Sequence, residues 1–170
     1  IAHYPQDEMV LAACNRLGIV TSVEIPVINT ITMSQKFSDN CVEMMKEMIY
    51  QCFNSPSVCI WAYMNEIMLR PLYNSESSIK KDEYLKYLYH IAERIENTAK
   101  EVDPGRATML PCHGNLAAYE EANLINLSDI LGMNLYNGWY GGEFSGFEAI
   151  LDTIHQKYPD KPIIISEYGA

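Results

Sequence analysis

The chain has 170 residues, with 12 Lys and Arg against 22 Asp and Glu, and a formal net charge of −10 at pH 7. This balance argues against a nucleic acid as a partner, because proteins that bind nucleic acids present a basic surface. It equally disfavours an anionic membrane surface. Hydrophobic residues make up 48% and charged residues 20%, which is typical of a globular domain. No apolar run approaches the ~20 residues of a membrane span.

The ends and the cysteines of the chain carry no targeting or metal signal. Ile1 to Pro5 form neither a basic start nor an apolar core, so no secretory signal is visible. Because the first residue is not Met, we expect the natural start to lie further upstream. The five cysteines show no CxxC spacing. We therefore expect free thiols that pack as small hydrophobic groups.

Amphipathic helical segments alternate with short apolar runs along the chain. The first helix is predicted to place Met9, Val10 and Leu17 on one buried side. Ser145 and Glu148 have the spacing of a capping box that would open the last helix. The predicted helices are 7–17, 39–53, 82–102, 116–124 and 145–158, and the predicted strands are 19–25, 57–63, 107–111, 129–135 and 161–166.

Strands that alternate with helices indicate an α/β protein with a parallel sheet and right-handed crossovers. Such a sheet is either open and doubly wound or part of a (β/α)8 barrel. An open sheet that binds nucleotides requires a glycine-rich turn after its first strand. The chain contains no GxGxxG or P-loop sequence, so nucleotide binding has little support.

Almost every predicted strand ends in a polar residue that its apolar body does not require. These residues are Glu24, Asn65, Glu66, His113, Asn134, Tyr136 and Glu167. In an α/β barrel the carboxyl ends of all strands meet on the face that carries the chemistry, so Glu66 and Glu167 are expected to face each other across one mouth. Two carboxylates across a cleft suit cleavage of a glycosidic bond. One protonates the leaving oxygen, and the other attacks the anomeric carbon or activates water.

Five motifs recur in the order of a known family. They are His3-Tyr4-Pro5, Val23-Glu24-Ile25-Pro26, Ser55 to Trp61 leading into Asn65-Glu66, Asn134 to Tyr140, and Ile165 to Gly169. Together they resemble the catalytic barrel of glycoside hydrolase family 2, which includes β-galactosidases, β-glucuronidases and β-mannosidases. The resemblance implies a single incomplete catalytic domain over residues 1–170. The expected fold is a partial (β/α)8 TIM barrel from about the end of the second strand through the seventh, with flanking helices.

The resemblance also implies a retaining β-glycosidase that works by double displacement. Glu66 would be the general acid/base, and Glu167 would be the nucleophile that forms a glycosyl-enzyme intermediate. The residues implied to bind the substrate are His3, Glu24, Asn65, Asn134, Tyr136 and Tyr140. Asn65 would contact the sugar 2-hydroxyl. The expected ligand is a β-linked carbohydrate, and this chemistry needs no metal and no cofactor.

Some features depart from the family pattern. Met64 stands where a small residue is expected, so its side chain either crowds the sugar or fills the pocket wall. His113 fits a sugar contact or a surface loop equally well. A whole barrel takes about 250 residues, and an arc of five strands leaves two open sheet edges. We expect these edges to pair with another copy, giving a homo-oligomer, or with the rest of a longer polypeptide.

A second class of function stays open at this point. The chain could be a non-catalytic carbohydrate-binding or structural barrel fragment that retains the acids but has lost turnover. Activity on nitrophenyl β-glycosides, and its response to Glu167→Gln, would distinguish the two classes. The sugar itself is not predicted, although residues 134–140 look most similar to the β-glucuronidase and gut-type β-galactosidase branches.

Overall fold

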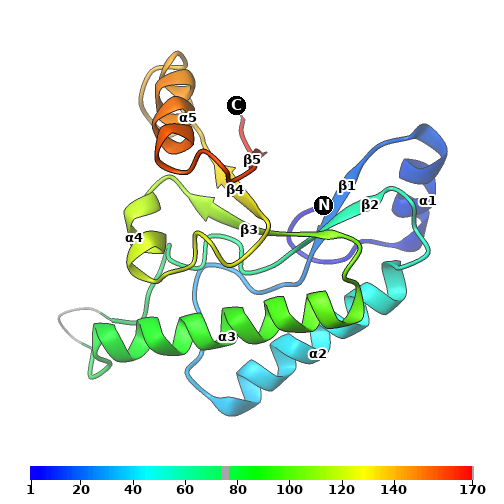
Figure 1. Ribbon diagram of the computed structural model, residues 1–170, viewed down its shortest axis with the longest axis horizontal. Coiled ribbons are helices and arrows are strands. Elements are labelled where there is room, and N and C mark those ends of the chain that lie inside the picture. The colour runs from blue at the N-terminus through cyan, green and yellow to red at the C-terminus, as the bar shows by residue number, and fades with distance from the viewer. Residues whose placement is uncertain (74–76, 170) are drawn as a thin grey trace.

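The computed structural model describes residues 1–73 and 77–169 as a parallel sheet with flanking helices (Figure 1). The strands are β1 (Thr21–Glu24), β2 (Val58–Ala62), β3 (Ala107–His113), β4 (Ile130–Asn134) and β5 (Ile163–Glu167). The helices are α1 (Glu8–Leu17), α2 (Gln35–Cys52), α3 (Lys81–Val102), α4 (Leu116–Glu121) and α5 (Gly146–Lys157). The strand order is β1-β2-β3-β4-β5, and every neighbouring pair is parallel. A sequential order belongs to a barrel arc and not to a doubly wound sheet, so the predicted partial barrel is confirmed.

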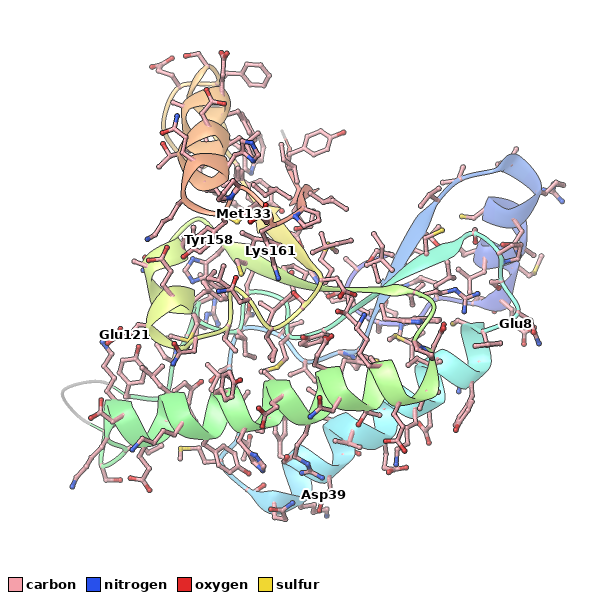
Figure 2. All side chains as sticks on the ribbon, in the orientation of Figure 1. Glu8, Asp39, Glu121, Met133, Tyr158 and Lys161 are labelled. Atoms are coloured by element: carbon pink, nitrogen blue, oxygen red, sulfur yellow. The ribbon has the colours of Figure 1, made fainter. Side chains whose placement is uncertain are left out.

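The convex face of the sheet is covered by α2 and α3, which run side by side (Figure 1). Leu88, Ile91 and Ile95 of α3 are fully buried, as are Met45 and Ile49 of α2. These positions recur at helical spacing, so the predicted apolar stripes are the ones that face the core. Side chains from the helices and the strands fill the layer between them, whereas Glu8 and Asp39 lie at the periphery (Figure 2). Each large side chain buried here contributes about 1.5–3 kcal/mol.

Polar groups on this convex face are paired with one another. The indole of Trp61 donates to Asp103 at 3.1 Å, and the hydroxyl of Tyr63 donates to Glu96 at 2.8 Å. Thr108 donates to the other oxygen of Glu96 at 2.9 Å. Because buried polar groups are costly when unpaired, these bonds fix how α3 sits on β2 and β3.

The prediction for the first helix is wrong in one respect. Met9 and Leu17 were expected on a buried side, yet their exposed fractions are 79% and 67%, and Val10 is also exposed. Leu11 is the buried residue of α1. The reason is position: α1 flanks the edge strand β1, and the described part of the chain supplies no helix on its outer side (Figure 1).

Two helix starts also differ from prediction. The second helix begins at Gln35 instead of residue 39, because Ser34 accepts a hydrogen bond from the Phe37 N–H at 3.3 Å and caps it. The predicted capping box at the last helix does not form. Ser145 already has helical dihedrals, φ −62° and ψ −12°, and makes no cap bond. A capping side chain normally reaches the first turn from a non-helical backbone.

The cysteines are free, but the expected packing as small hydrophobic groups does not hold for all five, because Cys59 is exposed and Cys14 is half-buried. Cys41, Cys52 and Cys112 are buried, and burial raises the pKa of the Cys41 thiol to about 11. Such thiols stay neutral and act as core residues. Across the two described ranges, no helix has both the length and the apolar character needed to cross a membrane.

Candidate active site

The carboxyl ends of the strands bring the candidate residues to one edge of the sheet. Glu24, His113, Asn134 and Glu167 are the last residues of β1, β3, β4 and β5, and Glu66 follows β2 after a short turn. Asn134 lies opposite His113 on one side and opposite Glu167 on the other. Parallel pairing therefore places residues from distant parts of the chain within one site.

An outer pocket of about 670 Å³ contains both candidate catalytic carboxylates. Its polar lining residues include Glu66, Glu167, His113, Asn134, Tyr136 and Tyr140. Tyr140 is 81% exposed at the rim, and its ring packs edge-on against Tyr136 with centroids 5.1 Å apart. Aromatic rings of this kind can cover an apolar sugar face while their hydroxyls remain available.

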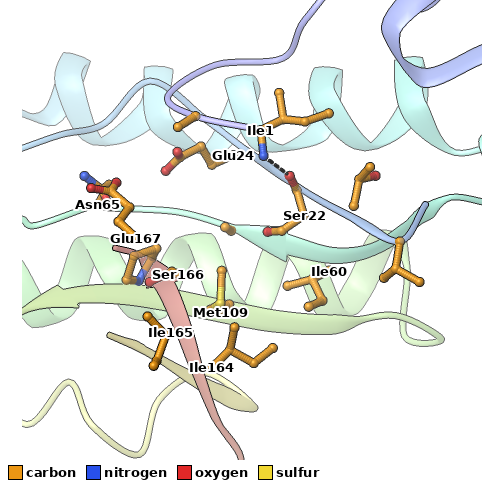
Figure 3. A pocket seen from close by; sticks show the side chains of 15 residues that line it. Ile1, Ser22, Glu24, Ile60, Asn65, Met109, Ile164, Ile165, Ser166 and Glu167 are labelled. Carbon is orange, nitrogen blue, oxygen red and sulfur yellow. Dashed lines mark hydrogen bonds between the residues drawn. The ribbon is translucent and has the colours of Figure 1, made fainter. Parts of the chain in front are cut away.

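An inner pocket of about 310 Å³ opens on the concave face of the sheet. Figure 3 shows Glu24, Asn65 and Glu167 gathered at one end of this pocket, and Ile60 and Met109 away from them. Glu167 lines both the inner and the outer pocket. Its carboxylate therefore lies where the two spaces meet.

One hydrogen bond holds the carboxylate of Glu167, and a histidine lies beside it. The hydroxyl of Tyr136 donates to Oε2 at 2.6 Å, and Nε2 of His3 lies 3.9 Å from Oε1. The bond to Glu167, more than burial, raises the pKa of Tyr136 above its ordinary value. Tyr136 therefore remains a donor, which restricts the rotamers open to Glu167.

His3 connects Glu167 to a second, more deeply buried acid. Nδ1 of His3 lies 3.1 Å from Oε1 of Glu24, whose side chain is only 8% exposed. Burial raises the pKa of Glu24, and the contact with His3 opposes this rise. The other oxygen, Oε2, is buried without a hydrogen-bond partner among the described residues.

The carboxylate of Glu66 is held by the side-chain amide of Asn134. Nδ2 of Asn134 donates to Oε1 of Glu66 at 3.1 Å and to Oδ1 of Asn65 at 3.0 Å. The hydroxyl of Ser166 donates to Oδ1 of Asn134 at 2.6 Å. Asn65 and Asn134 are 4% and 3% exposed, so the bond between the two amides is buried, whereas Glu66 and Ser166 at the ends of the chain of bonds are partly exposed.

The backbone around Glu66 has an uncommon conformation. Met64 and Glu66 have φ values of 58° and 50°, in the left-handed region, which costs a non-glycine residue on the order of 1–3 kcal/mol. The Glu66 N–H donates to the Pro111 carbonyl at 2.9 Å, and the Asn65 carbonyl accepts from Asn29 at 3.0 Å. These bonds hold the turn that aims Glu66 into the pocket. Met64 is fully buried in the core, and it is not among the residues that line the outer or the inner pocket.

His113 lies at the pocket and not on a surface loop. Its Nδ1 accepts from the Asn115 N–H at 3.1 Å, and its ring packs edge-on against Tyr119 at 5.2 Å. Because Nδ1 accepts, the neutral ring carries its proton on Nε2.

Several residues of the site were not predicted from the sequence. Leu69, Asn137 and Ile150 line the outer pocket, and Ser166 lines the inner one. Leu69 and Ile150 are apolar and carry no signal that separates them from core residues. Ser166 did offer a signal, since it is a polar residue that directly follows three isoleucines at the end of the predicted strand. Within residues 1–73 and 77–169, no group of three or more His, Cys, Asp or Glu side chains is placed to hold a metal ion.

The fold and the position of the site define a partial (β/α)8 barrel with its pocket at the carboxyl ends of the strands. Residues 1–170 match the family described as "Glycosyl hydrolases family 2, TIM barrel domain". The chain belongs to this family, and the resemblance recognised in its five motifs is confirmed.

Known relatives are larger proteins that contain this region. The β-glucuronidase of Bacteroides fragilis is 32% identical over 177 residues, which cover 100% of this chain and 23% of that protein. Human β-glucuronidase is 31% identical, with 99% and 25% covered. The crystal structure of Bacteroides uniformis β-glucuronidase is similar with a TM-score of 0.90 and 40% identity, over 100% of this chain and 20% of that one. The chain thus spans a quarter or less of the length of these relatives.

Proposed function

We propose that the chain carries the catalytic residues of a retaining β-glycosidase, with β-glucuronides as the favoured substrate class. Membership of a glycoside hydrolase family supports the reaction type. The β-glucuronidase relatives support a glucuronide as the substrate. The observation that carries the proposal is that Glu66 and Glu167, which come from different strands, line one pocket.

The proposed reaction has two displacements. Glu167 attacks the anomeric carbon while Glu66 gives its proton to the leaving oxygen, so the glycosidic bond breaks and a glycosyl ester forms. Glu66, now a carboxylate, then takes a proton from water as the water attacks the anomeric carbon. The ester bond breaks, the sugar leaves, and both glutamates return to their starting states.

The remaining candidates fit around these two groups. Oδ1 of Asn65 is engaged by Asn134, which leaves its amide N–H groups for the sugar 2-hydroxyl. Tyr140 at the rim is placed to contact the sugar ring. His3 and Glu24 lie on the Glu167 side, where we expect them to border the bound sugar.

A covalent probe tests the nucleophile directly. The compound cyclophellitol-6-carboxylate aziridine is bound covalently in a structure of Bacteroides uniformis β-glucuronidase 2. We expect the chain to gain the mass of this compound, with the adduct on the peptide that contains Glu167. Glu167→Gln should abolish labelling, whereas Glu47→Gln, an exposed acid on α2, should leave it unchanged. Labelling that survives Glu167→Gln would remove Glu167 from the nucleophile role.

Hydrolysis of nitrophenyl β-glucuronide and β-galactoside, measured in parallel, tests the reaction and the sugar. Faster release from the glucuronide supports the proposed substrate class. Three results together would favour the alternative function as a non-catalytic carbohydrate-binding fragment. These are no cleavage of either substrate, no covalent adduct, and retained binding of the sugar.

The sheet edges support a further proposal about assembly. Within the described residues, β1 and β5 each pair on one side only, and unpaired strand edges favour association. We expect self-association of the isolated chain, measured by sedimentation velocity across a range of concentrations. A monomer at all concentrations would contradict this expectation.

A further inference from the structure

Ser166 occupies an irregular position in the last strand. Met133 lies opposite Ile165, but the next residue, Asn134, lies opposite Glu167. Ser166 therefore has no partner in the register. Such irregularities bend a strand and re-aim side chains, often beside active sites. Here the hydroxyl of Ser166 is aimed at Oδ1 of Asn134, at 2.6 Å.

The neighbouring strand leaves room for this hydroxyl. A Cβ atom at Gly132 would lie 3.0 Å from the Ser166 Oγ and 3.0 Å from the Pro111 Cα. Contacts this short are unfavourable, so a side chain at residue 132 would displace the hydroxyl or the adjacent strand. The glycine thus accommodates the bond between Ser166 and Asn134.

Asn134 has little polar capacity left for a sugar. Its Nδ2 donates to Asn65 and Glu66, and its Oδ1 accepts from Ser166. A reversed amide would place Oδ1 of Asn134 against Oδ1 of Asn65 and Oε1 of Glu66, which accept hydrogen bonds in the observed arrangement. The Ser166 hydroxyl satisfies Oδ1 in the observed orientation. Without it, Oδ1 would be buried and unpaired, and the amide would gain by rotating toward another donor.

We propose that Ser166 is a positioning residue for the acid/base. Its hydroxyl fixes the Asn134 amide, and the amide holds the Glu66 carboxyl toward the position of the glycosidic oxygen. Asn134 accordingly acts through Glu66 and Asn65 and not as a direct sugar contact. This inference rests on the proposed function, since it assigns proton transfer to Glu66.

The first test measures the amide itself and needs no turnover. The side-chain NH2 signal of Asn134 is assigned by NMR through its loss in Asn134→Asp. Ser166→Ala should speed solvent exchange of these protons by about two- to tenfold, the change expected when an ordinary hydrogen bond is lost. Ser166→Thr keeps a hydroxyl and should retain slow exchange. Unchanged exchange in Ser166→Ala would overturn the proposal.

Ser22→Ala is the matched control for loss of a serine hydroxyl. Ser22 lines the same inner pocket, and no hydrogen bond of its hydroxyl occurs among the residues that the structure describes. Its substitution should leave the Asn134 exchange rate as it is in the unsubstituted chain. A loss of protection in this control equal to that in Ser166→Ala would show a general loosening and would contradict a specific role for Ser166.

The second test uses the chemistry of the leaving group. Two β-glucuronides are compared, one with a 2,4-dinitrophenyl group, which leaves without a proton, and one with an alkyl group, which requires one. Ser166→Ala should lower kcat/KM for the alkyl substrate by about 10–100-fold, because general acid catalysis is impaired. The effect on the dinitrophenyl substrate should stay within about threefold, and Ser166→Thr should restore both.

The outcomes separate this inference from the proposed function. An equal loss on both substrates would mean that Ser166 supports the pocket in general, and it would overturn the link to Glu66. If the unsubstituted chain cleaves neither substrate, the catalytic part fails together with the proposed function. Amide exchange still decides in that case whether Ser166 holds Asn134.

Discussion

The convex and concave faces of the sheet are built from alternate residues of the same strands, yet they differ in what covers them and in how their polar groups are paired. Trp61 of β2 and Tyr63, which follows this strand, point toward α3 and its C-terminal cap, where their polar tips are bonded to Asp103 and Glu96. Ala62, between them, faces the concave pocket. The convex face is covered by the helices α2 and α3 (Figure 1), whereas the concave face carries the inner pocket, which is lined by both apolar and acidic side chains (Figure 3).

This difference separates stability from chemistry within one sheet. On the convex face the polar groups named above are paired inside the protein. At the concave face and its rim, one oxygen of Glu24 is buried without a described partner, and Met64 and Glu66 have left-handed backbone conformations. Proteins commonly accept such local costs at functional sites because packing elsewhere compensates for them. Substitutions on the convex face should therefore change mainly the unfolding free energy, and substitutions at the concave face and its rim should change mainly the catalytic activity.

The largest effect is expected at Glu66. Glu66→Gln should lower kcat/KM by about 10²–10⁴-fold, the usual contribution of a general acid. The unfolding free energy should change by less than ~1 kcal/mol, since Glu66 is partly exposed and Gln still accepts from Asn134. Enzyme kinetics and urea denaturation check the two statements. A variant that loses activity and stability in parallel would break the separation between the faces.

A core truncation on the convex side should mainly lower the stability of the chain. Leu88 of α3 is fully buried, and Leu88→Ala should lower the unfolding free energy by about 2–5 kcal/mol through lost burial and a cavity. Lys86→Ala, exposed on the same helix, should stay within about 0.5 kcal/mol. Urea denaturation of both variants provides the comparison. Equal stabilities would show that α3 does not pack on the sheet as described.

The pH dependence of stability should sharpen the role of the buried acid Glu96. Burial raises the pKa of Glu96 above 4.5, and the bonds from Tyr63 and Thr108 oppose the rise. Its stabilising contribution is therefore complete below pH 4.5 and is lost as the pH rises through the higher folded-state pKa. Relative to Glu96→Gln, the unsubstituted chain should lose stability as the pH rises from 4.5 through the folded-state pKa of Glu96. Parallel stability curves for the two proteins would contradict this assignment.

The smallest effect is expected on α1 at the edge of the arc. Met9→Gln should change the unfolding free energy by less than about 0.5 kcal/mol, because Met9 is 79% exposed. Leu11→Ala, at the buried position of the same helix, should cost about 2–5 kcal/mol. Thermal and chemical denaturation measure both. A large loss in Met9→Gln would show that this side of α1 is covered in solution.

The sequence by itself determined the alternation of strands and helices and the polar residues that close each strand. Both are local properties: apolar periodicity follows from how a helix or strand turns its side chains, and a strand end is visible where the apolar run stops. The five family motifs then predicted which residues belong to one site. His3 and Glu167, separated by nearly the whole chain, do lie 3.9 Å apart.

Only the tertiary structure decided the properties of a residue that depend on the element packed against it. The exposure of Met9 and Leu17 follows from the place of α1 at the edge of the arc. The aim of Ser166 follows from the register between β4 and β5. The hydrogen bonds that occupy the Asn134 amide come from two other parts of the chain, the turn after β2 with Asn65 and Glu66, and the strand β5 with Ser166. Burial and hydrogen bonding are properties of pairs of elements, and the pattern of one segment contains no information about the surface that faces it.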